Sequence, residues 1–281
     1  MKSRILTGVI GGGLALVLLL FCPDICLNIA FVPVCALAMY EILIVTRYVS
    51  HRGLMAAAVA FSMMTPFFME TESRMPALIA MMLYVLVLGI VQVAYHDKLP
   101  VERTGFVFFV SVIVSIALSC TVYLPALNRV HGRFYVFLAF IIPWLCDIGA
   151  YFVGTFLGKH KLCPAISPKK TVEGFIGGIV ISVGASVLAG WLYQVIHLTP
   201  NALGTVNLWE VGILALALAP FSVLGDLFAS SIKRQSSVKD FGHIFPGHGG
   251  VMDRFDSMIF VSPLLFIVLQ FLPLVYPLGQ L

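Results

Sequence analysis

Nine stretches of the chain are apolar over close to the length, about 20 residues, that a helix needs to cross a lipid bilayer. Only 11% of the residues are charged and 60% are hydrophobic, whereas a soluble domain carries about 25% charged residues. The sequence therefore predicts an all-α, polytopic integral membrane protein with about nine transmembrane helices. The apolar stretches are residues 5–22, 25–46, 54–70, 76–95, 105–125, 134–157, 173–197, 209–230 and 257–278.

The lysines and arginines between these stretches indicate an orientation. If the N-terminus and every second connection share one side of the membrane, that side holds 14 of the 17 Lys and Arg residues. The other side holds only Arg74, Arg129 and Arg133. Because short cytoplasmic loops are enriched in Lys and Arg, we expect a cytoplasmic N-terminus and a C-terminus on the opposite side. The six cysteines form no CxxC pair, so neither a zinc site nor a disulfide framework is indicated.

Residues 226–256 are strongly polar in this otherwise apolar chain. They contain four Asp, two Lys, two Arg, two His and four Gly. The first part has a helical pattern that places four polar side chains on one face, namely Asp226, Ser230, Lys233 and Arg234. Near the end, Asp253 and Asp256 have the i, i+3 spacing that aims two carboxylates at one point from a helical turn. Between them, Gly247, Gly249 and Gly250 leave backbone N–H groups open to an anion.

This mixture of carboxylates, cations and backbone amides suits a phosphate compound bound with a metal ion. Hard oxygen ligands with few Cys or His favour Mg²⁺. We assign His248 to phosphate contact or loop ordering, and His243 to a structural role. The glycines do not form a GxxxxGK[ST] P-loop, and the basic residues form no aromatic-interleaved patch, so nucleic acid is not an expected partner.

Three acids fall inside predicted spans, where an ionised side chain costs about 2.5–3.5 kcal/mol on insertion scales. Glu41 lies near a span end with Arg47 about two turns later, so we interpret it as a paired or interface-reaching acid. Asp147 lies in mid-span, and Asp226 opens the polar stretch. Ala150, Gly154 and Gly158 recur every four residues on the Asp147 helix and predict close helix packing, as do Gly174 and Gly178 on the next.

A second polar segment, residues 167–174, reads as a helix start. Pro168 suits a first turn, Ser or Thr suits the cap, and two lysines beside free N–H groups suit an anion. The alternative is a basic connection that only fixes topology.

Both polar segments resemble the phosphatidate cytidylyltransferases (CDP-diacylglycerol synthases). The longer match runs from Ser230-Ser231-Ile232-Lys233-Arg234 through Lys239-Asp240-Phe241-Gly242 and Pro246-Gly247-His248-Gly249-Gly250 to Asp253-Arg254-Phe255-Asp256, and the shorter is Ser167-Pro168-Lys169-Lys170-Thr171-Val172-Glu173-Gly174. The resemblance implies that the chain transfers a cytidylyl group from CTP to phosphatidic acid. It also implies Mg²⁺ with a second cation, K⁺ being the candidate, and a homodimer in a bacterial plasma membrane with its active site facing the cytoplasm.

On this resemblance we expect residues 1–130 to form an N-terminal transmembrane region of about five helices. Residues 131–281 would form the catalytic transmembrane region with the signature loop 230–256. The metal ligands would be Asp226 and Asp253. The expected catalytic residues are Asp226, Asp253, Asp256, Lys239 and Asp147. The expected substrate-binding residues are Ser167, Lys169, Lys170, Thr171, Ser230, Lys233, Arg234, His248, Gly249, Gly250 and Arg254.

Three other functions fit parts of the pattern. A CDP-alcohol phosphotransferase would need an Asp-Gly-x-x-Ala-Arg helix, which is absent from this sequence. A CTP-dependent lipid kinase would share the nucleotide but release CDP instead of pyrophosphate. A transporter or channel would explain the spans and the buried acids but not a Gly-rich, cation-rich connection with this spacing.

Overall fold

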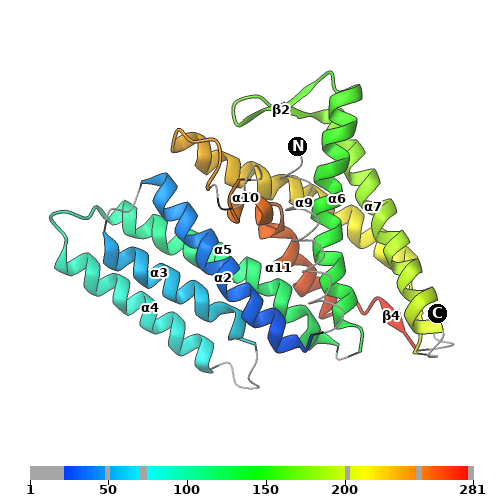
Figure 1. Ribbon diagram of the computed structural model, residues 1–281, viewed down its shortest axis with the longest axis horizontal. Coiled ribbons are helices and arrows are strands. Elements are labelled where there is room, and N and C mark those ends of the chain that lie inside the picture. The colour runs from blue at the N-terminus through cyan, green and yellow to red at the C-terminus, as the bar shows by residue number, and fades with distance from the viewer. Residues whose placement is uncertain are drawn as a thin grey trace. The chain divides into compact units, whose positions relative to one another are not determined.

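Long helices dominate the structure, a computed structural model that describes residues 22–47, 51–69, 75–128, 130–199, 203–242, 244 and 249–277. Within these ranges, six helices are long and apolar enough to cross a membrane (Figure 1). They are α2 (Asp24–Thr46), α4 (Met75–Ala94), α5 (Val101–Leu127), α6 (Gly132–Leu157), α7 (Val172–Tyr193) continued by the π-helical η2 (Gln194–Leu198), and α9 (Leu208–Gln235). The prediction of an all-α, multi-pass membrane protein is confirmed.

Two further predicted spans are shorter helices in the structure. Residues 54–70 form α3 (Arg52–Met64) and the 3₁₀ turn η1 (Thr65–Phe67), where Pro66 interrupts the α-helical hydrogen bonding. Residues 257–278 form α11 (Met258–Leu269), which ends before Pro273. Most of the first predicted span, residues 5–21, lies outside the described residues. The number nine therefore stays a prediction.

The remaining elements are short. They are the one-turn helix α10 (Met252–Phe255) and two antiparallel pairs of strands, β1 (Lys161–Cys163) with β2 (Ser167–Thr171) and β3 (Thr205–Val206) with β4 (Val275–Tyr276).

The chain folds into two compact units. The first comprises the residues up to Tyr123 and Ile232–Phe255, and the second comprises Leu124–Ser231 and the residues from Asp256 onward. The predicted division of the chain near residue 130 into an N-terminal and a catalytic region stays a prediction.

Buried hydroxyl groups connect the helices of the first unit. Ser115 of α5 donates from Oγ to Ser62 Oγ of α3 at 2.6 Å, and Ser119 donates to Thr65 Oγ1 at 2.8 Å. Tyr84 of α4 also has its hydroxyl 2.6 Å from an α5 serine hydroxyl. Because lipid offers no hydrophobic drive for helix association, such hydrogen bonds are a main source of helix–helix specificity in membranes.

Glycines bring α6 and α7 together in the second unit. A Cβ added to Gly178 would lie 2.6 Å from the Cys146 carbonyl oxygen, and one added to Gly174 would lie 3.0 Å from the Gly154 Cα. These distances leave no space for a side chain, so the two backbones are in direct contact. The close packing predicted from the small-residue spacing is confirmed, and it joins two helices of the same chain (Figure 1).

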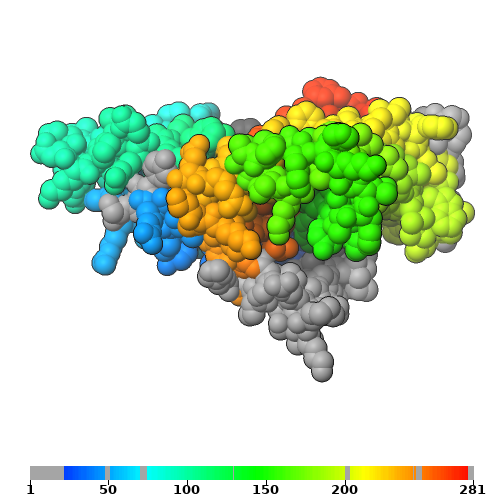
Figure 2. All heavy atoms as spheres, turned by 90° about the horizontal axis from the view of Figure 1, so that it is seen from above, coloured from blue at the N-terminus to red at the C-terminus, as the bar shows by residue number. Residues whose placement is uncertain are grey.

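A hairpin connects these two helices and corrects one prediction. Residues Ser167–Thr171 form strand β2, paired with β1, so Pro168 is not in a helical first turn. The helix begins at Val172, where Thr171 accepts a hydrogen bond from the Gly174 N–H at 3.1 Å, as expected of an N-cap threonine. In Figure 2, where the colour follows residue number, the atoms of α6 and of the hairpin are green.

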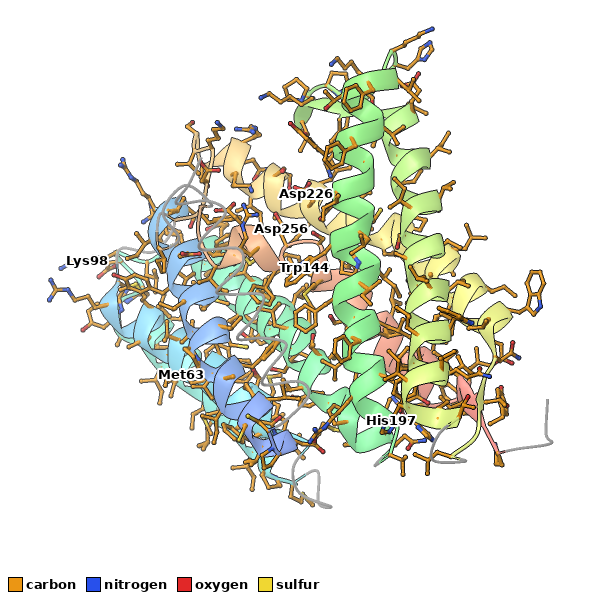
Figure 3. The ribbon with its side chains drawn as sticks, turned by 45° about the vertical axis from the view of Figure 1, so that its right-hand side comes forward. Met63, Lys98, Trp144, His197, Asp226 and Asp256 are labelled. Atoms are coloured by element: carbon orange, nitrogen blue, oxygen red, sulfur yellow. The ribbon has the colours of Figure 1, made fainter. Side chains whose placement is uncertain are left out.

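An aromatic and histidine cluster lies where α6 begins and α7 ends, at the opposite end of these helices from the hairpin. His131 Nδ1 lies 3.1 Å from the Tyr193 hydroxyl, and His197 stacks on the Tyr193 ring (His197 is labelled in Figure 3). Burial, and then the neighbouring His197, lower the pKa of His131 below its ordinary value of 6.5.

Candidate active site

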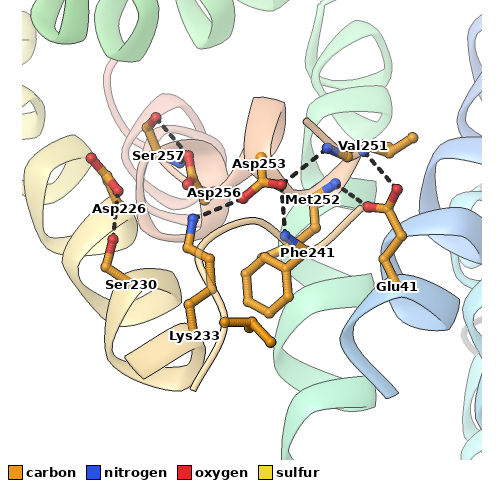
Figure 4. Close-up of polar contacts among 12 residues, drawn as sticks. Glu41, Asp226, Ser230, Lys233, Phe241, Val251, Met252, Asp253, Asp256 and Ser257 are labelled. Carbon is orange, nitrogen blue, oxygen red and sulfur yellow. Dashed lines mark hydrogen bonds and ion pairs between the residues drawn. The ribbon is translucent and has the colours of Figure 1, made fainter. Parts of the chain in front are cut away.

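Asp253 is the centre of a polar cluster in the first unit. Its Oδ1 accepts a hydrogen bond from Lys233 Nζ at 2.8 Å, and its Oδ2 accepts from the backbone N–H groups of Phe241 at 2.8 Å and Gly250 at 3.0 Å (Figure 4). Asp253 lies on α10, Lys233 lies in the last turns of α9, and the other two residues lie in the loop between. One carboxylate therefore fixes the loop at both ends.

The ion pair within this cluster is almost completely buried. Only 9% of the Lys233 side chain and 6% of the Asp253 side chain are exposed. The Lys233 ammonium group also lies 5.1 Å from the centre of the Phe241 ring, within the range of a cation–π contact. A buried ammonium and carboxylate persist when each satisfies the other, and removing one partner leaves a costly uncompensated charge.

Gly249 of the loop is required by the closeness of this carboxylate. Gly249 has φ of +85°, a left-handed conformation that side chains rarely adopt, and a Cβ there would lie 3.0 Å from Asp253 Oδ2. We predicted that the amides of Gly249 and Gly250 would face a phosphate. In the structure the Gly250 N–H donates to Asp253, and the phosphate contact stays a prediction.

Glu41 of α2 contributes a second buried carboxylate to the first unit. It is 4% exposed and accepts the backbone N–H of Val251 through Oε1 at 3.0 Å and that of Met252 through Oε2 at 2.9 Å. The interpretation of Glu41 as an acid that pairs with a neighbouring arginine or reaches the interface missed these contacts. Its partners are more than 200 residues away in sequence, and no local pattern indicates them.

A second pairing of aspartate and lysine lies in the second unit. Lys170, at the end of the β1–β2 hairpin, places Nζ 2.6 Å from Asp226 Oδ2 of α9. Ser230, one helical turn after Asp226, donates to Asp226 Oδ1 at 3.1 Å, which confirms the predicted shared face for these two residues. About a quarter of the Asp226 side chain is exposed, 26%, so this carboxylate remains accessible.

Two more acids of the second unit are bridged by a serine. Ser257 donates from Oγ to Asp147 Oδ2 of α6 at 2.5 Å, and its backbone N–H donates to Asp256 Oδ1 at 2.8 Å. Gly225 lies against the backbone at Asp256, since a Cβ there would lie 2.5 Å from the Asp256 carbonyl oxygen. Asp226 and Asp256 are therefore near neighbours, as Figure 3 also shows. Ser257 was not predicted, although its position directly after Asp256 was a usable signal.

Most of the other predicted residues that the structure describes lie at the surface. Lys169, Lys239 and Arg254 are exposed, and Ser167 is half-buried in β2. Arg234 is exposed and donates from Nη1 to the Val238 carbonyl oxygen at 3.2 Å. His243 and His248 lie outside the described residues, so their predicted roles stay predictions.

The carboxylates can be compared with what a metal ion requires. Among the described residues, no three His, Cys, Asp or Glu side chains converge on a point that could hold a metal ion. Mg²⁺ does not need such a cage, because it commonly takes one or two carboxylates and completes its shell with water and substrate phosphates. Asp226 offers a hard, partly exposed oxygen donor that is held in place by Ser230, whereas a metal ion at Asp253 would have to replace Lys233 or the backbone N–H groups that bind it. This donor chemistry fits Mg²⁺.

Comparison with known proteins gives a consistent result over nearly the whole chain. The sequence matches the family described as "Cytidylyltransferase family" over residues 2–272. It is 35% identical over 274 residues to the phosphatidate cytidylyltransferase of Bacillus subtilis, covering 96% of this chain and 97% of that protein. It is 47% identical to the phosphatidate cytidylyltransferase of Staphylococcus saprophyticus and 49% identical to that of Staphylococcus aureus. Each of these two matches spans 142 residues, which is 50% of this chain and 51% of the relative.

Proposed function

Because the chain belongs to the cytidylyltransferase family, we propose that it transfers the cytidylyl group of CTP to phosphatidic acid. The products are CDP-diacylglycerol and pyrophosphate, and the reaction is a step of phospholipid biosynthesis. Similarity to the Bacillus subtilis phosphatidate cytidylyltransferase over 97% of that protein supports this assignment. The multi-pass membrane architecture suits a lipid substrate.

The structural observation that carries the proposal is the repeated pairing of aspartate with lysine. In the first unit Lys233 lies 2.8 Å from Asp253, and in the second unit Lys170 lies 2.6 Å from Asp226. The reaction must bring a phosphate monoester up to a triphosphate, so repulsion between anions is its main obstacle. Lysine ammonium groups offset that repulsion, and their neighbouring carboxylates keep them in place until substrate arrives.

The chemistry itself asks little of a general base. An oxygen of the phosphatidate phosphate attacks the α-phosphorus of CTP, and the bond from that phosphorus to the bridging oxygen of pyrophosphate breaks. The attacking phosphate is already largely ionised near pH 7. Lys170 and Lys233 would therefore act by orienting and neutralising phosphates. Lys239, Arg234 and Arg254 provide additional exposed positive charge for the same purpose.

Magnesium is part of the proposal. Asp226 and Asp253 would hold Mg²⁺, with Asp147 and Asp256 as supporting acids and with a second cation, K⁺ being the candidate. A metal ion held there would supply positive charge that offsets the charge of the phosphoryl group and of pyrophosphate. The support is the donor chemistry of the carboxylates and the need to offset the charge of two polyanions.

We also propose nine spans with a cytoplasmic N-terminus, an active site that faces the cytoplasm, and a homodimer. The support for the orientation is the excess of Lys and Arg on one predicted side, 14 of 17. A cytoplasmic site would receive CTP directly from solution. The homodimer follows from the family resemblance alone, and the mass of the detergent-solubilised protein tests it.

The test uses purified protein in detergent with CTP, phosphatidic acid and Mg²⁺. We expect CDP-diacylglycerol and pyrophosphate in equal amounts, and no product after EDTA treatment. Asp226→Asn and Asp253→Asn should each abolish transfer, whereas Asp97→Asn, which neutralises an acid with 82% of its side chain exposed, should leave it intact. Full activity in either of the first two variants would refute their role.

A further inference from the structure

Glu41 has no role in the function proposed above, yet it is among the most buried ionisable residues of the first unit. It lies on α2, a helix that is otherwise apolar enough to cross a membrane. A buried carboxylate is expensive unless several donors satisfy it. Two consecutive backbone N–H groups, of Val251 and Met252, donate to Glu41. These two amides lead directly into Asp253.

The surrounding backbone is shaped to fit this carboxylate. A Cβ added to Gly242 or to Gly250 would collide with the carboxylate atoms of Glu41. Neither glycine has positive φ, so a requirement for unusual backbone angles does not explain them. The space taken by the Glu41 side chain explains both.

Glu41 and Asp253 thus hold the same loop by complementary contacts. Asp253 accepts hydrogen bonds from the backbone N–H groups of Phe241 and Gly250 (Figure 4). Glu41 accepts hydrogen bonds from the two residues that follow Gly250, Val251 and Met252. Phe255 at the end of α10 also packs edge-on against Phe31 of α2, with ring centroids 6.0 Å apart. Helix α2 therefore fixes both the start and the end of the short helix that carries Asp253.

We propose that Glu41 is a positioning residue for cytidylyl transfer, which acts by holding the Val251–Met252 backbone so that Asp253 keeps its place beside Lys233. The expected effect on kcat rests on the proposed function, whereas the expected effect on the loop conformation rests on the structure alone. Glu41 does not need to contact CTP or phosphatidate. Its loss should reduce the rate of the bound complex more than the affinity for the lipid.

The main test compares Glu41→Gln with the wild-type protein. Glutamine keeps the shape of the side chain but turns an NH₂ group toward the backbone N–H of Val251 or Met252, so that hydrogen bond is lost. We expect kcat to fall about 10- to 100-fold, the loss that corresponds to one hydrogen bond to a charged group. The KM for phosphatidate should stay within about twofold, because Glu41 does not contribute to the binding of the lipid. Glu102→Gln, an exposed acid of the same unit, is the matched control and should leave kcat unchanged.

Hydrogen exchange provides a readout that does not depend on activity. In Glu41→Gln the amides of Val251 and Met252 should exchange faster, while those of α4 keep their wild-type protection. If Glu41→Gln does not fold, Gly242→Ala perturbs the same carboxylate from the loop side and should lower kcat in the same way.

Wild-type kcat in a folded Glu41→Gln or Gly242→Ala protein would overturn the inference. So would a loss of kcat accompanied by faster exchange throughout the first unit, because that result would mean a general structural role. Failure of the proposed function looks different. The wild-type protein would then form no CDP-diacylglycerol, while the exchange experiment would still decide whether Glu41 holds the loop.

Discussion

Removing one charge of the Lys233–Asp253 pair should destabilise the first unit by about 3–5 kcal/mol, because the partner charge stays buried. With 6% of the Asp253 side chain exposed, water cannot replace the lost partner. Asp253→Asn also turns an NH₂ group toward the donors that now bind the carboxylate, so its cost should lie at the upper end of that range. Lys233→Met leaves Asp253 with the N–H groups of Phe241 and Gly250, so its cost should lie at the lower end.

The double variant separates charge pairing from packing. With both charges gone, neither partner is left uncompensated, and the double variant should be more stable than the sum of the single losses predicts. We expect a coupling free energy of about 2–3 kcal/mol, typical of residues in direct contact. Equilibrium unfolding in mixed detergent micelles, followed by circular dichroism, measures all four proteins of the cycle.

An exposed contact between a histidine and an aspartate in the same unit is the matched comparison. His96 and Asp97 lie 2.9 Å apart with 73% and 82% of their side chains exposed. Asp97→Asn should change stability by less than about 1 kcal/mol. Additive losses in the Lys233–Asp253 cycle, or single-variant losses as small as that of Asp97→Asn, would refute the reasoning that this pair is buried and mutually compensating.

Two further predictions concern the second unit. Gly178→Ala should destabilise the protein by about 1–3 kcal/mol, because the added Cβ would lie 2.6 Å from the Cys146 carbonyl oxygen. Gly184 is on the same helix, and a Cβ added there would have no atom within 4 Å, so Gly184→Ala should be neutral or stabilising by up to about 1 kcal/mol. Equal effects of the two substitutions on the melting temperature would contradict the packing argument. Because the pKa of His131 is lowered from 6.5, its neutral form favours the fold, so the stability that it contributes is present above pH 6.5 and is lost as pH falls toward the lower folded pKa. The melting temperature should fall over that window and fall less in His131→Asn; parallel curves would show that His131 is not the cause.

The sequence was sufficient to predict the membrane class and most of the long helices. Hydrophobic run length and the i, i+4 pattern are local properties, and Asp226 with Ser230 formed the predicted contact. The spacing of small residues along α6 and α7, also a local property, predicted the close packing of these two helices. The run-length rule was less reliable near prolines, where α3 and α11 became shorter than the apolar stretches that contain them.

The contacts that organise the site could not be read from local pattern. Glu41 and Val251 are separated by 210 residues, and Asp147 and Ser257 by 110. The sequence shows that Glu41 and Asp147 are acids within apolar spans, but it does not show which distant residues the tertiary fold places beside them. The glycines of the loop were attributed to substrate phosphates, whereas carboxylates of the chain itself, Asp253 and Glu41, occupy the space beside Gly249 and Gly250.

The position of the transferred phosphorus tests the central claim most directly. Purified protein is given phosphatidic acid, Mg²⁺ and CTP that carries a radioactive label on either the α- or the γ-phosphorus, and the label in the lipid phase is counted. Cytidylyl transfer predicts that α-label enters the lipid and that γ-label stays in water as pyrophosphate. Lipid labelled from the γ-position would show kinase chemistry, and unlabelled lipid in both arms would show no transfer; either result would contradict the account.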